Sequence, residues 1–502
     1  MASPSFDLRL PRRPLQTAAG QDAQMVEAVS SLRPPPAVQP RQWQTQLIQL
    51  LRRRLELGGH NDVLINAGPG AGKTLGALLS FERLEREGRL QHLLVFCHRS
   101  SIASQWLTAA QRLGLDLRDW QPGLNLTATG EPRPHGLLIT YQAAGRNLEL
   151  LEQQLQAANW GPWLAIADEV HHLGMDPEEP EATAWGHGFS RLTAAARLRL
   201  GLTGTPFRAD NLAFCAARRI QVHDGQDWVE QIAPDLSVEP RELIAAGDVR
   251  PLEFRFQDGW VDHSREGELG DSERSPLSQE QRESWRARNL RRAIRLGDSS
   301  SIALRLLLNA RRRLETVRRE HTGAGGLVIA RDIAHARRIC GLLEEQGDRV
   351  HLVHSQDPEA AQRMDAFKRG EADWLVSIDM CAEGFDAPRL RVVAYLTTVV
   401  TRTRFVQGIT RAVRMDGARA ALESVPRHPS YVFAPADPLL MQYARTWSLS
   451  EPYVLRAKPV EAEPESTGAG RATALPLHAI EDGAGAVIRM RGPQLPNFRL
   501  QR

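Results

Sequence analysis

A glycine-rich run that ends in lysine and threonine offers the clearest chemistry in this sequence: Ala67-Gly68-Pro69-Gly70-Ala71-Gly72-Lys73-Thr74. Glycines let backbone N–H groups turn towards an anion, and a helix that begins at the same place adds its dipole. A lysine would reach the β- and γ-phosphates of a nucleotide, and a threonine hydroxyl would hold Mg²⁺. The run predicts a cradle for the phosphates of ATP, made by Gly68, Gly70, Ala71, Gly72, Lys73 and Thr74. A glycine-rich turn in an ordinary βαβ unit is the alternative.

The rarity of lysine strengthens the prediction for Lys73. The chain has only three lysines, the others being Lys368 and Lys458, and it uses arginine almost everywhere else. A lysine in the run fits a need for a compact ammonium group rather than a planar guanidinium. The usual phosphate-loop pattern begins with glycine where Ala67 stands here, and we do not expect this departure to abolish hydrolysis.

An acidic pair, Asp168-Glu169, directly follows the apolar run 163–167. Adjacent carboxylates at the end of a buried strand are costly without a cation. We therefore expect Asp168 to hold Mg²⁺ through water, and Glu169 to orient and deprotonate the water that attacks the γ-phosphate. His171 and His172 follow, but the chain has no other ligands at metal spacing near them, so a polar or packing role is favoured over zinc.

Two further groups suit a nucleotide. Gln44 opens a predicted helix, 44–57, just before the glycine-rich run. Its amide could pair with N6 and N7 of adenine, and an ordinary surface glutamine is the alternative.

Gln407, Arg411 and Arg414 have the spacing of one helical face, with no acidic residue between them. Such a face would attract a γ-phosphate presented by another part of the chain, and a solvated basic face is the alternative.

The elements that must position these residues are predicted by short apolar runs, each followed by a helix or loop. The runs are 63–66, 93–97, 137–139, 163–167 and 198–202, and later 326–330, 350–353, 374–378 and 391–396. This alternation is typical of an α/β protein with parallel sheets, in which functional residues lie at the strand ends.

Composition fits a globular chain, with 42% hydrophobic and 25% charged residues. A net charge of +3 does not by itself indicate a nucleic-acid partner. The four cysteines lack paired spacing and are expected to be reduced thiols. No apolar run approaches the roughly 18 residues of a membrane span, and no secretory signal is recognised, so we expect a cytoplasmic protein, associated with the nucleoid in a bacterium.

The expected division of the chain has five parts: a flexible segment, 1–36; an ATP-binding domain, 37–212; a linker or insert, 213–322; a second domain, 323–445; and a mostly flexible tail, 446–502, whose apolar patch 486–488 could dock as a short segment. The linker is expected to hold a strand at 252–256, a loop from Asp262 to Ser278 and two arginine-rich helices, 279–296 and 299–320. Those arginines could form a solvated face with glutamate partners or contact a phosphate backbone.

Taken together, these residues resemble the motifs of superfamily 2 helicases and translocases, especially the relatives of the helicase subunit of restriction enzymes. The resembling segments are, in order, Arg41 to Gln44 (the adenine-reading motif), 67–74 (motif I), 96–106 (Ia), 168–172 (II, of the DEAH type), 203–206 (III), 383–386 (V) and 407–414 (VI). The resemblance spans about residues 37–445. Thr410 stands where motif VI normally has glycine.

The resemblance implies two RecA-like P-loop domains with parallel sheets, joined by a partly helical linker, and ATP with Mg²⁺ in the cleft between them. Lys73, Thr74, Asp168 and Glu169 would lie on one side; Gly384, Asp386, Arg411 and Arg414, with Gln407 of the same motif, would close from the other. The implied partner is a nucleic acid, with DNA favoured over RNA. The leading hypothesis is an ATP-dependent helicase or translocase.

Two alternatives stay open: an ATPase that remodels or clamps protein–DNA complexes without unwinding, and a plain ATPase with no nucleic-acid role. A restriction nuclease core usually pairs acids with a lysine two residues after an Asp or Glu. The residues two places before the three lysines are Ala71, Ala366 and Arg456, so cutting would require a separate nuclease or repair partner.

Overall fold

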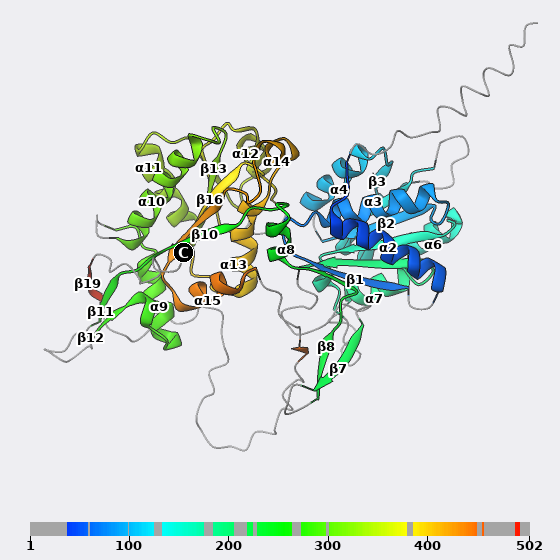
Figure 1. The fold of residues 1–502 in the computed structure, drawn as a ribbon, viewed down its shortest axis with the longest axis horizontal. Helices are drawn as coiled ribbons and strands as arrows, with labels where there is room; N and C mark the ends of the chain where they lie inside the picture. The colour runs from blue at the N-terminus through cyan, green and yellow to red at the C-terminus, as the bar shows by residue number, and fades with distance from the viewer. Residues whose placement is uncertain are drawn as a thin grey trace, which may run out of the picture.

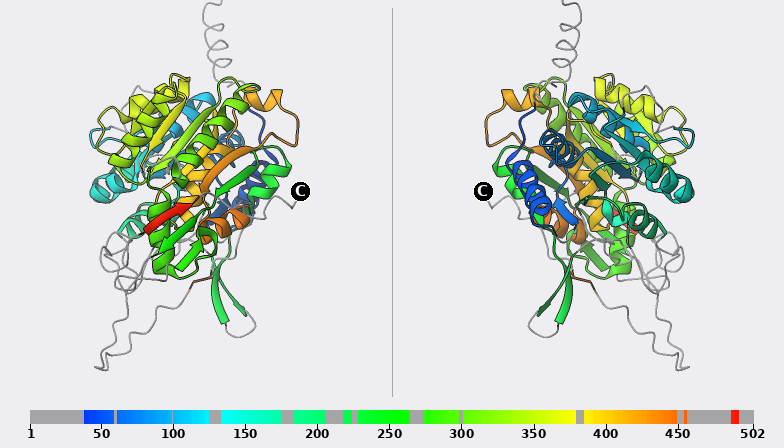
Figure 2. Two further views of the ribbon diagram at one scale, coloured as in Figure 1. Left: turned by 90° about the vertical axis from the view of Figure 1, so that its left-hand side faces the viewer. Right: turned by 90° about the vertical axis from the view of Figure 1, so that its right-hand side faces the viewer.

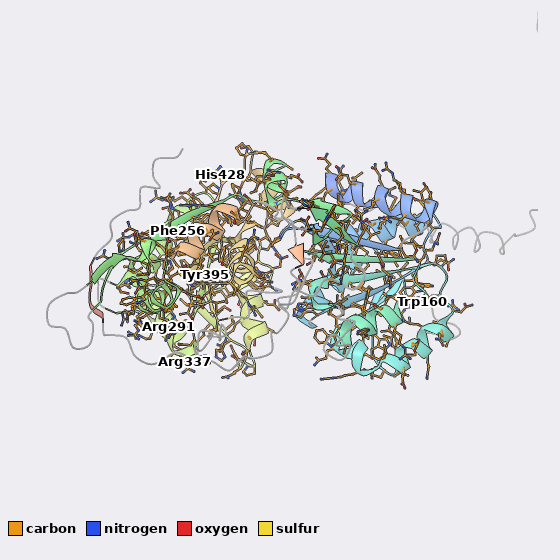
Figure 3. The ribbon with its side chains drawn as sticks, turned by 90° about the horizontal axis from the view of Figure 1, so that it is seen from below. Trp160, Phe256, Arg291, Arg337, Tyr395 and His428 are labelled. Carbon is orange, nitrogen blue, oxygen red and sulfur yellow. The ribbon has the colours of Figure 1, made fainter. Side chains whose placement is uncertain are left out.

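Two lobes, each built on a parallel β-sheet, make up most of the computed structural model (Figure 1). The structure describes residues 38–58, 61–98, 100–124, 133–174, 184–204, 218–223, 228–263, 273–297, 301–378, 385–448, 454–455 and 487–491. Figure 3 views both lobes from below, with Trp160 in the first and Tyr395 in the second.

The first sheet has seven parallel strands in the order β3-β4-β2-β5-β6-β1-β9. Their bounds are β1 (Asp62–Ala67), β2 (His92–Cys97), β3 (Leu117–Asp119), β4 (Gly136–Thr140), β5 (Trp163–Asp168), β6 (Leu198–Thr203) and β9 (Leu236–Val238). All five runs predicted in this part of the chain are strands of this sheet. The strands β3 and β9 were missed because three residues are too few to give a readable pattern.

Both faces of this sheet are covered, which explains its nearly continuous apolar strands. Val63 and Ile65 belong to one buried cluster with α2, α3 and α4, whereas Leu64 belongs to the other with α5, α6 and α7. The helices are α2 (Gln42–Leu57), α3 (Lys73–Arg86), α4 (Ser100–Arg112), α5 (Tyr141–Arg146), α6 (Leu148–Ala158) and α7 (Ala184–Leu192). Each fully buried Leu, Val or Ile contributes about 1.5–3 kcal/mol relative to an exposed one.

The second sheet has six parallel strands in the order β10-β17-β16-β13-β15-β14. Their bounds are β10 (Leu252–Gln257), β13 (Gly325–Ala330), β14 (Val350–Val353), β15 (Trp374–Ser377), β16 (Leu390–Leu396) and β17 (Ser430–Pro435). The packed helices are α10 (Ile302–Arg318), α11 (Ile333–Glu345), α12 (Ala360–Arg369), α13 (Arg402–Ile409) and α15 (Pro438–Thr446). Two parallel sheets flanked by helices confirm the predicted fold class.

The expected linker, 213–322, is not separate from the two domains. Its strand β9 extends the first sheet, with Ile65 opposite Leu236, and its strand β10 extends the second, with Leu252 opposite Ser430. The partner strands lie about 170 residues away in sequence, so no local pattern could reveal these pairings. The helix α8 (Pro240–Ala245) and its flanking residues lead from β9 of the first sheet to β10 of the second, and α8 lies between the lobes in Figure 1.

Smaller antiparallel pairings fill the periphery. The hairpin of β7 (Arg219–His223) and β8 (Trp228–Ile232) projects from the molecule (Figure 2), and its Trp228 is 70% exposed. The short strand β18 (Val454–Leu455) pairs with β8. The expected loop Asp262–Ser278 is wrong at its ends, because β11 (Trp260–His263) pairs with β12 (Glu273–Pro276).

The docked segment expected in the tail is present as β19 (Val487–Arg491), which pairs with β11. The first arginine-rich helix, α9 (Glu283–Ala293), is shorter than predicted. The remaining short helices are the 3-10 turns η1 (Val170–His172), η3 (Leu277–Gln279) and η5 (Thr410–Val413), and the α-helix α14 (Gly417–Leu422). Among the described residues, no helix is long and apolar enough to cross a membrane.

Candidate active site

The glycine-rich run connects β1 to the first turn of α3, as the sequence predicted. Gly70 and Gly72 both have φ of 80°, a left-handed conformation that suits glycine. Within the described residues, the backbone N–H groups of Gly72, Lys73 and Thr74 donate to no protein acceptor. Unengaged N–H groups at the start of a 14-residue helix form a site for an anion.

Lys73 lies between the loop and the acidic pair. Its Nζ donates to the carbonyl of Ala67 over 3.1 Å and lies 3.7 Å from Oε1 of Glu169. The side chain is 14% exposed, so the ammonium group is largely enclosed by protein. A phosphate entering the loop would find this cation close to the first-domain carboxylates.

Asp168 is the last residue of β5 and is held from two sides. Trp106 Nε1 donates to its Oδ2 over 2.9 Å, and the Tyr141 hydroxyl donates to its backbone carbonyl over 2.7 Å. Burial and the adjacent charge of Glu169 raise the pKa of Asp168 to about 6, against the weaker opposing effects of Trp106 and Lys73. A carboxylate that is buried beside a second carboxylate fits a divalent cation, which would lower the cost of both charges.

Glu169 follows in an uncommon backbone conformation, with φ of 52° for a non-glycine residue. Burial alone would raise the pKa of Glu169, but the charges of Lys73, His171, His172 and Arg411 outweigh it and lower that pKa. The carboxylate is therefore ionised at neutral pH, as a proton acceptor must be. The effect of Arg411 also means that the second domain contributes to the electrostatics of this group.

The two histidines after the acidic pair contact neighbouring polar and aromatic side chains. His171 Nδ1 lies 3.3 Å from the Thr203 hydroxyl at the end of β6, and the ring of His172 stacks on His98 at 4.2 Å. No cluster of His, Cys, Asp and Glu suited to a metal ion occurs among the described residues. Of the predicted motif III, Thr205 and Pro206 lie outside the described residues, as does Arg99 of motif Ia.

Arg411 and Arg414 of the second domain lie near the first-domain residues, with Arg411 acting on the charge of Glu169 and Arg414 beside Gly70, but they do not share one helical face as predicted. The helix α13 ends at Ile409, η5 follows, and Arg414 is extended, with ψ of 149°. Thr410 explains the change, because its hydroxyl donates to the Val406 carbonyl over 2.5 Å and so favours a tightened turn there.

In this geometry both arginines contact acceptors of the second domain, whereas the side-chain oxygen of Gln407 has no hydrogen-bond donor among the described residues. Arg414 Nη1 lies 2.9 Å from Oδ1 of Asp386, and Arg411 Nη1 donates to the Phe385 carbonyl over 3.0 Å. The Oε1 atom of Gln407 is buried and, in the part of the chain that the structure describes, accepts no hydrogen bond. An unpaired buried acceptor calls for a water or ligand donor. Gly384 lies outside the described residues.

Gln44 is not an ordinary surface glutamine, which was the alternative to its predicted contact with adenine. The side chain is fully buried; its Oε1 accepts from the Arg41 backbone over 2.9 Å and its Nε2 donates to the Gly72 carbonyl over 3.0 Å. Gln44 thus supports the phosphate loop, and its contact with adenine stays a prediction. Sequence reasoning missed two other residues of this region, Arg41 as a loop contact and Trp106 as a partner of Asp168, because neither pairing is local.

Several of the arginines in the two arginine-rich helices belong to the scaffold. They are Arg286 with Asp437 (3.0 Å), Arg311 with Asp348 (2.7 Å), Arg318 with Asp373 (2.9 Å) and Arg313 over the ring of Tyr431. For the first three of these arginines, the ion pairs favour acidic partners over contact with a phosphate backbone. Arg282 and Arg288 flank the ring of Trp285.

The donor set fits ATP and Mg²⁺. The loop N–H groups and Lys73 provide donors for phosphates, and the hydroxyl of Thr74 with the carboxylate of Asp168 would hold the cation, which neutralises phosphate charge. The assignment of these roles to individual residues stays a prediction.

Comparison with known proteins agrees with this geometry. Residues 37–208 match the family described as "Type III restriction enzyme, res subunit", and residues 309–416 match the "Helicase conserved C-terminal domain". The first match contains most of the first sheet and the second most of the second sheet.

Relatives and solved structures extend the likeness over most of the chain. "Uncharacterized protein Rv2917" of Mycobacterium tuberculosis is 31% identical over 403 residues, covering 78% of this chain and 61% of that protein. "Uncharacterized protein ML1624" of Mycobacterium leprae is 30% identical over 424 residues, covering 82% and 65%. The chain therefore spans less than two thirds of the length of these relatives.

A fragment assigned to the HsdR subunit of a type I restriction enzyme from Vibrio vulnificus has a similar fold, with a TM-score of 0.50 and 16% identity over 82% of this chain and 67% of that one. The two family matches thus fall, in order, on two parallel-sheet domains of RecA-like fold. The chain therefore resembles the superfamily 2 helicases, with its first domain matching the family of the res subunit of restriction enzymes and its second matching the helicase C-terminal domain.

Proposed function

We propose that this chain is an ATP-dependent nucleic-acid helicase or translocase that hydrolyses ATP between its two domains. The observation that carries the proposal is the convergence of Lys73, Asp168 and Glu169 from the first domain with Arg411 from the second, close enough that the charge of Arg411 lowers the pKa of Glu169. A cation, a metal-binding carboxylate, a base and a basic residue from a separate domain are the parts that phosphoryl transfer requires.

Each residue has a proposed task. Gln44 contacts adenine; the backbone of Gly68, Gly70, Ala71 and Gly72, with Lys73, holds the phosphates; and Thr74 and Asp168 hold Mg²⁺, which polarises the phosphoryl group. Glu169 takes the proton of the attacking water. Gln407, Arg411 and Arg414 contact the γ-phosphate from the second domain, beside Gly384 and Asp386. Closure of the domains during this cycle would move a strand bound across both.

DNA is the proposed track, because the res subunit whose family model matches the first domain is named for restriction enzymes. The alternative is a DNA-stimulated ATPase that remodels or clamps protein–DNA complexes without unwinding. A separate nuclease or repair protein is the proposed partner for any cleavage, because none of the three lysines has the spacing of the common nuclease core.

The test is the steady-state ATPase rate without polymer and with single-stranded DNA, duplex DNA or RNA, each at low and moderate salt. Strong stimulation by one polymer that fades with salt would support a motor and identify its track. An unchanged rate with every polymer would count against a nucleic-acid role. A strand-displacement assay on a substrate with blocked ends would separate unwinding from clamping.

A further inference from the structure

Three side chains at the start of α2 hold three successive carbonyls of the phosphate loop. Arg41 Nη1 donates to Gly70 over 2.7 Å, Trp43 Nε1 to Ala71 over 3.0 Å, and Gln44 Nε2 to Gly72 over 3.0 Å. A trans peptide points its N–H away from its carbonyl. Fixing the carbonyls of Ala71 and Gly72 towards α2 therefore turns the N–H groups of Gly72 and Lys73 to the opposite side.

Arg41 is the member of this set that also contacts the segment between the domains. Its Nη2 donates to the Asp248 carbonyl over 3.3 Å, and its Nε lies 3.4 Å from the Asp248 carboxylate. Burial lowers the pKa of Arg41 and Asp248 opposes this effect, but the guanidinium stays charged at any physiological pH. One guanidinium thus joins Gly70 in the loop to Asp248, which follows α8.

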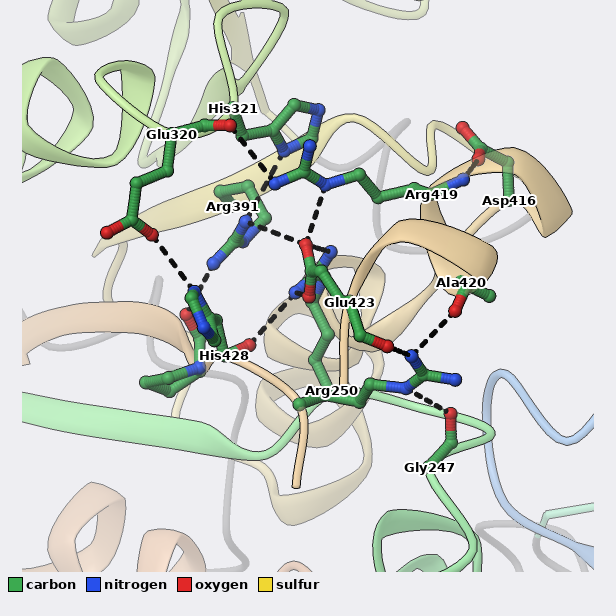
Figure 4. Close-up of polar contacts among 12 residues, drawn as sticks. Gly247, Arg250, Glu320, His321, Arg391, Asp416, Arg419, Ala420, Glu423 and His428 are labelled. Carbon is green, nitrogen blue, oxygen red and sulfur yellow. Dashed lines mark hydrogen bonds and ion pairs between the residues drawn. The ribbon is translucent and has the colours of Figure 1, made fainter. Parts of the chain in front are cut away.

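The segment 247–250 is fastened to the second domain (Figure 4). The Gly247 carbonyl accepts from Arg427 over 2.9 Å, and the buried guanidinium of Arg250 makes two bonds, of 2.5 and 2.7 Å, to Glu423. The backbone N–H of Arg250 donates to the Val413 carbonyl over 2.8 Å. Because these groups are buried and paired, the segment should move with the second domain rather than with the first.

Gly70 lies where the loop, this segment and the second domain meet. A Cβ atom at Gly70 would lie 3.0 Å from Val249 and 3.1 Å from Val413, so the surfaces are already in contact at this point. Val413 lies two residues after Arg411 and directly before Arg414. A shift of the Gly70 carbonyl would thus change the contacts of Arg41 with Asp248 and the packing against Val413 beside the two arginines.

We propose that Arg41 is a positioning residue that couples occupancy of the phosphate loop to closure of the second domain through Asp248. The proposal rests on the proposed ATP-binding function and adds the path by which the two domains respond to each other. The guanidinium suits the task because its planar fork can donate to two acceptors at once, whereas a lysine ammonium at the same place could not span both in that geometry.

The experiment measures nucleotide affinity and domain closure separately. Nucleotide affinity is followed with a fluorescent ATP analogue, and closure with energy transfer between dyes on the exposed residues Gln153 and Arg337, in a chain whose native cysteines are replaced. The variants are Arg41→Lys, Asp248→Asn and the double variant. The matched control is Arg52→Lys, on the same helix, where the arginine pairs with Glu87 at the surface.

We expect Arg41→Lys and Asp248→Asn to bind the analogue with affinity within about threefold of the parent, while the nucleotide concentration that gives half-closure rises at least about fivefold. The double variant should be no worse than the more affected single variant, because both remove one interaction. The control should match the parent in both measurements.

Normal closure in both single variants would overturn the proposal and leave the proposed ATPase intact. A parallel loss of affinity and closure, or additive losses in the double variant, would also overturn it, because that pattern indicates general damage to the loop. If the parent itself fails to bind the analogue, the proposed function fails and the coupling fails with it. Equal melting temperatures of all variants would verify that each is folded.

Discussion

The indole N–H of Trp106 donates a 2.9 Å hydrogen bond to the carboxylate of Asp168, and it does so from a fully buried position on α4. This contact stabilises the ionised form of Asp168, and it opposes the burial and the adjacent charge of Glu169, which together still raise the pKa of Asp168 to about 6. The indole is therefore one of the few groups that keep Asp168 available to a cation near neutral pH.

Replacing Trp106 with Phe should raise the pKa of Asp168 further and weaken its hold on Mg²⁺. A hydrogen bond to a charged group is worth about 1.5–3 kcal/mol, so the Mg²⁺ concentration for half-maximal ATPase should rise about tenfold or more at pH 7. The acid limb of the pH–rate profile should move to higher pH. Tyr141→Phe is the matched control, because it removes a bond to the backbone carbonyl of Asp168 and leaves the bond from Trp106 to the carboxylate in place. An identical response of the two variants would contradict the assignment.

Replacing Glu169 with Gln should leave ATP binding within a few-fold of the parent and reduce turnover by about 100-fold or more, because the amide cannot accept the proton of the attacking water. Nucleotide binding by equilibrium titration and single-turnover hydrolysis would separate the two effects. Lys73→Ala is the comparison and should lose both. Near-normal turnover by the Glu169→Gln protein would mean that another group is the base.

Replacing Arg414 with Ala should reduce kcat by about 100-fold while KM for ATP changes much less, if the guanidinium acts on the charge that develops in the transition state. In the structure this residue contacts Asp386, so the variant also frees that carboxylate. Steady-state kinetics with the exposed Arg337→Ala as control would measure both constants. A rise in KM with unchanged kcat would instead indicate a contact with bound ATP in its ground state.

Acidification should destabilise the second domain through His321. Burial and the charges of Arg419, Arg391 and Arg250 lower the pKa of His321 to about 4, from an ordinary value of 6.5. Between those two pH values His321 is protonated in the unfolded chain but not in the folded chain. The free energy of unfolding therefore decreases as the pH falls from 6.5 towards 4.

His321→Gln should remove this part of the acid sensitivity. Melting midpoints at pH 7.5, 6.0 and 4.5 would test it, with roughly 2–4 °C expected for each kcal/mol recovered. The exposed His428→Gln variant serves as control. If the parent and the His321→Gln protein lose the same number of degrees on acidification, the histidine does not carry the effect.

The parts of the site that could be predicted are those whose residue types are dictated by local chemistry. The Asp168-Glu169 pair directly follows one strong apolar run, and Lys73 follows another across the glycine-rich loop; each run is a strand of the first sheet. The histidines were also correctly expected to pack, and His172 does stack on His98.

What could not be predicted depends on contacts between distant residues. Trp106 and Asp168 are 62 positions apart, and Arg41 and Asp248 are 207 apart. The end of α13 at Ile409 was missed for a different reason, since the spacing of Gln407, Arg411 and Arg414 is equally compatible with a continuous helix and with one that tightens at Thr410. Strands of three residues, such as β9, carry too little pattern to be seen.

The position of β1 between β6 and β9 has a consequence for synthesis of the chain. Residues 62–67 leave the ribosome long before residues 198–203 and 236–238, which supply both of their hydrogen-bonded neighbours. Until then the strand that leads into the phosphate loop has two open edges, a state prone to wrong pairing. The loop can reach its final form only after translation has passed residue 238, so nascent chains truncated before and after that point should differ sharply in protease resistance.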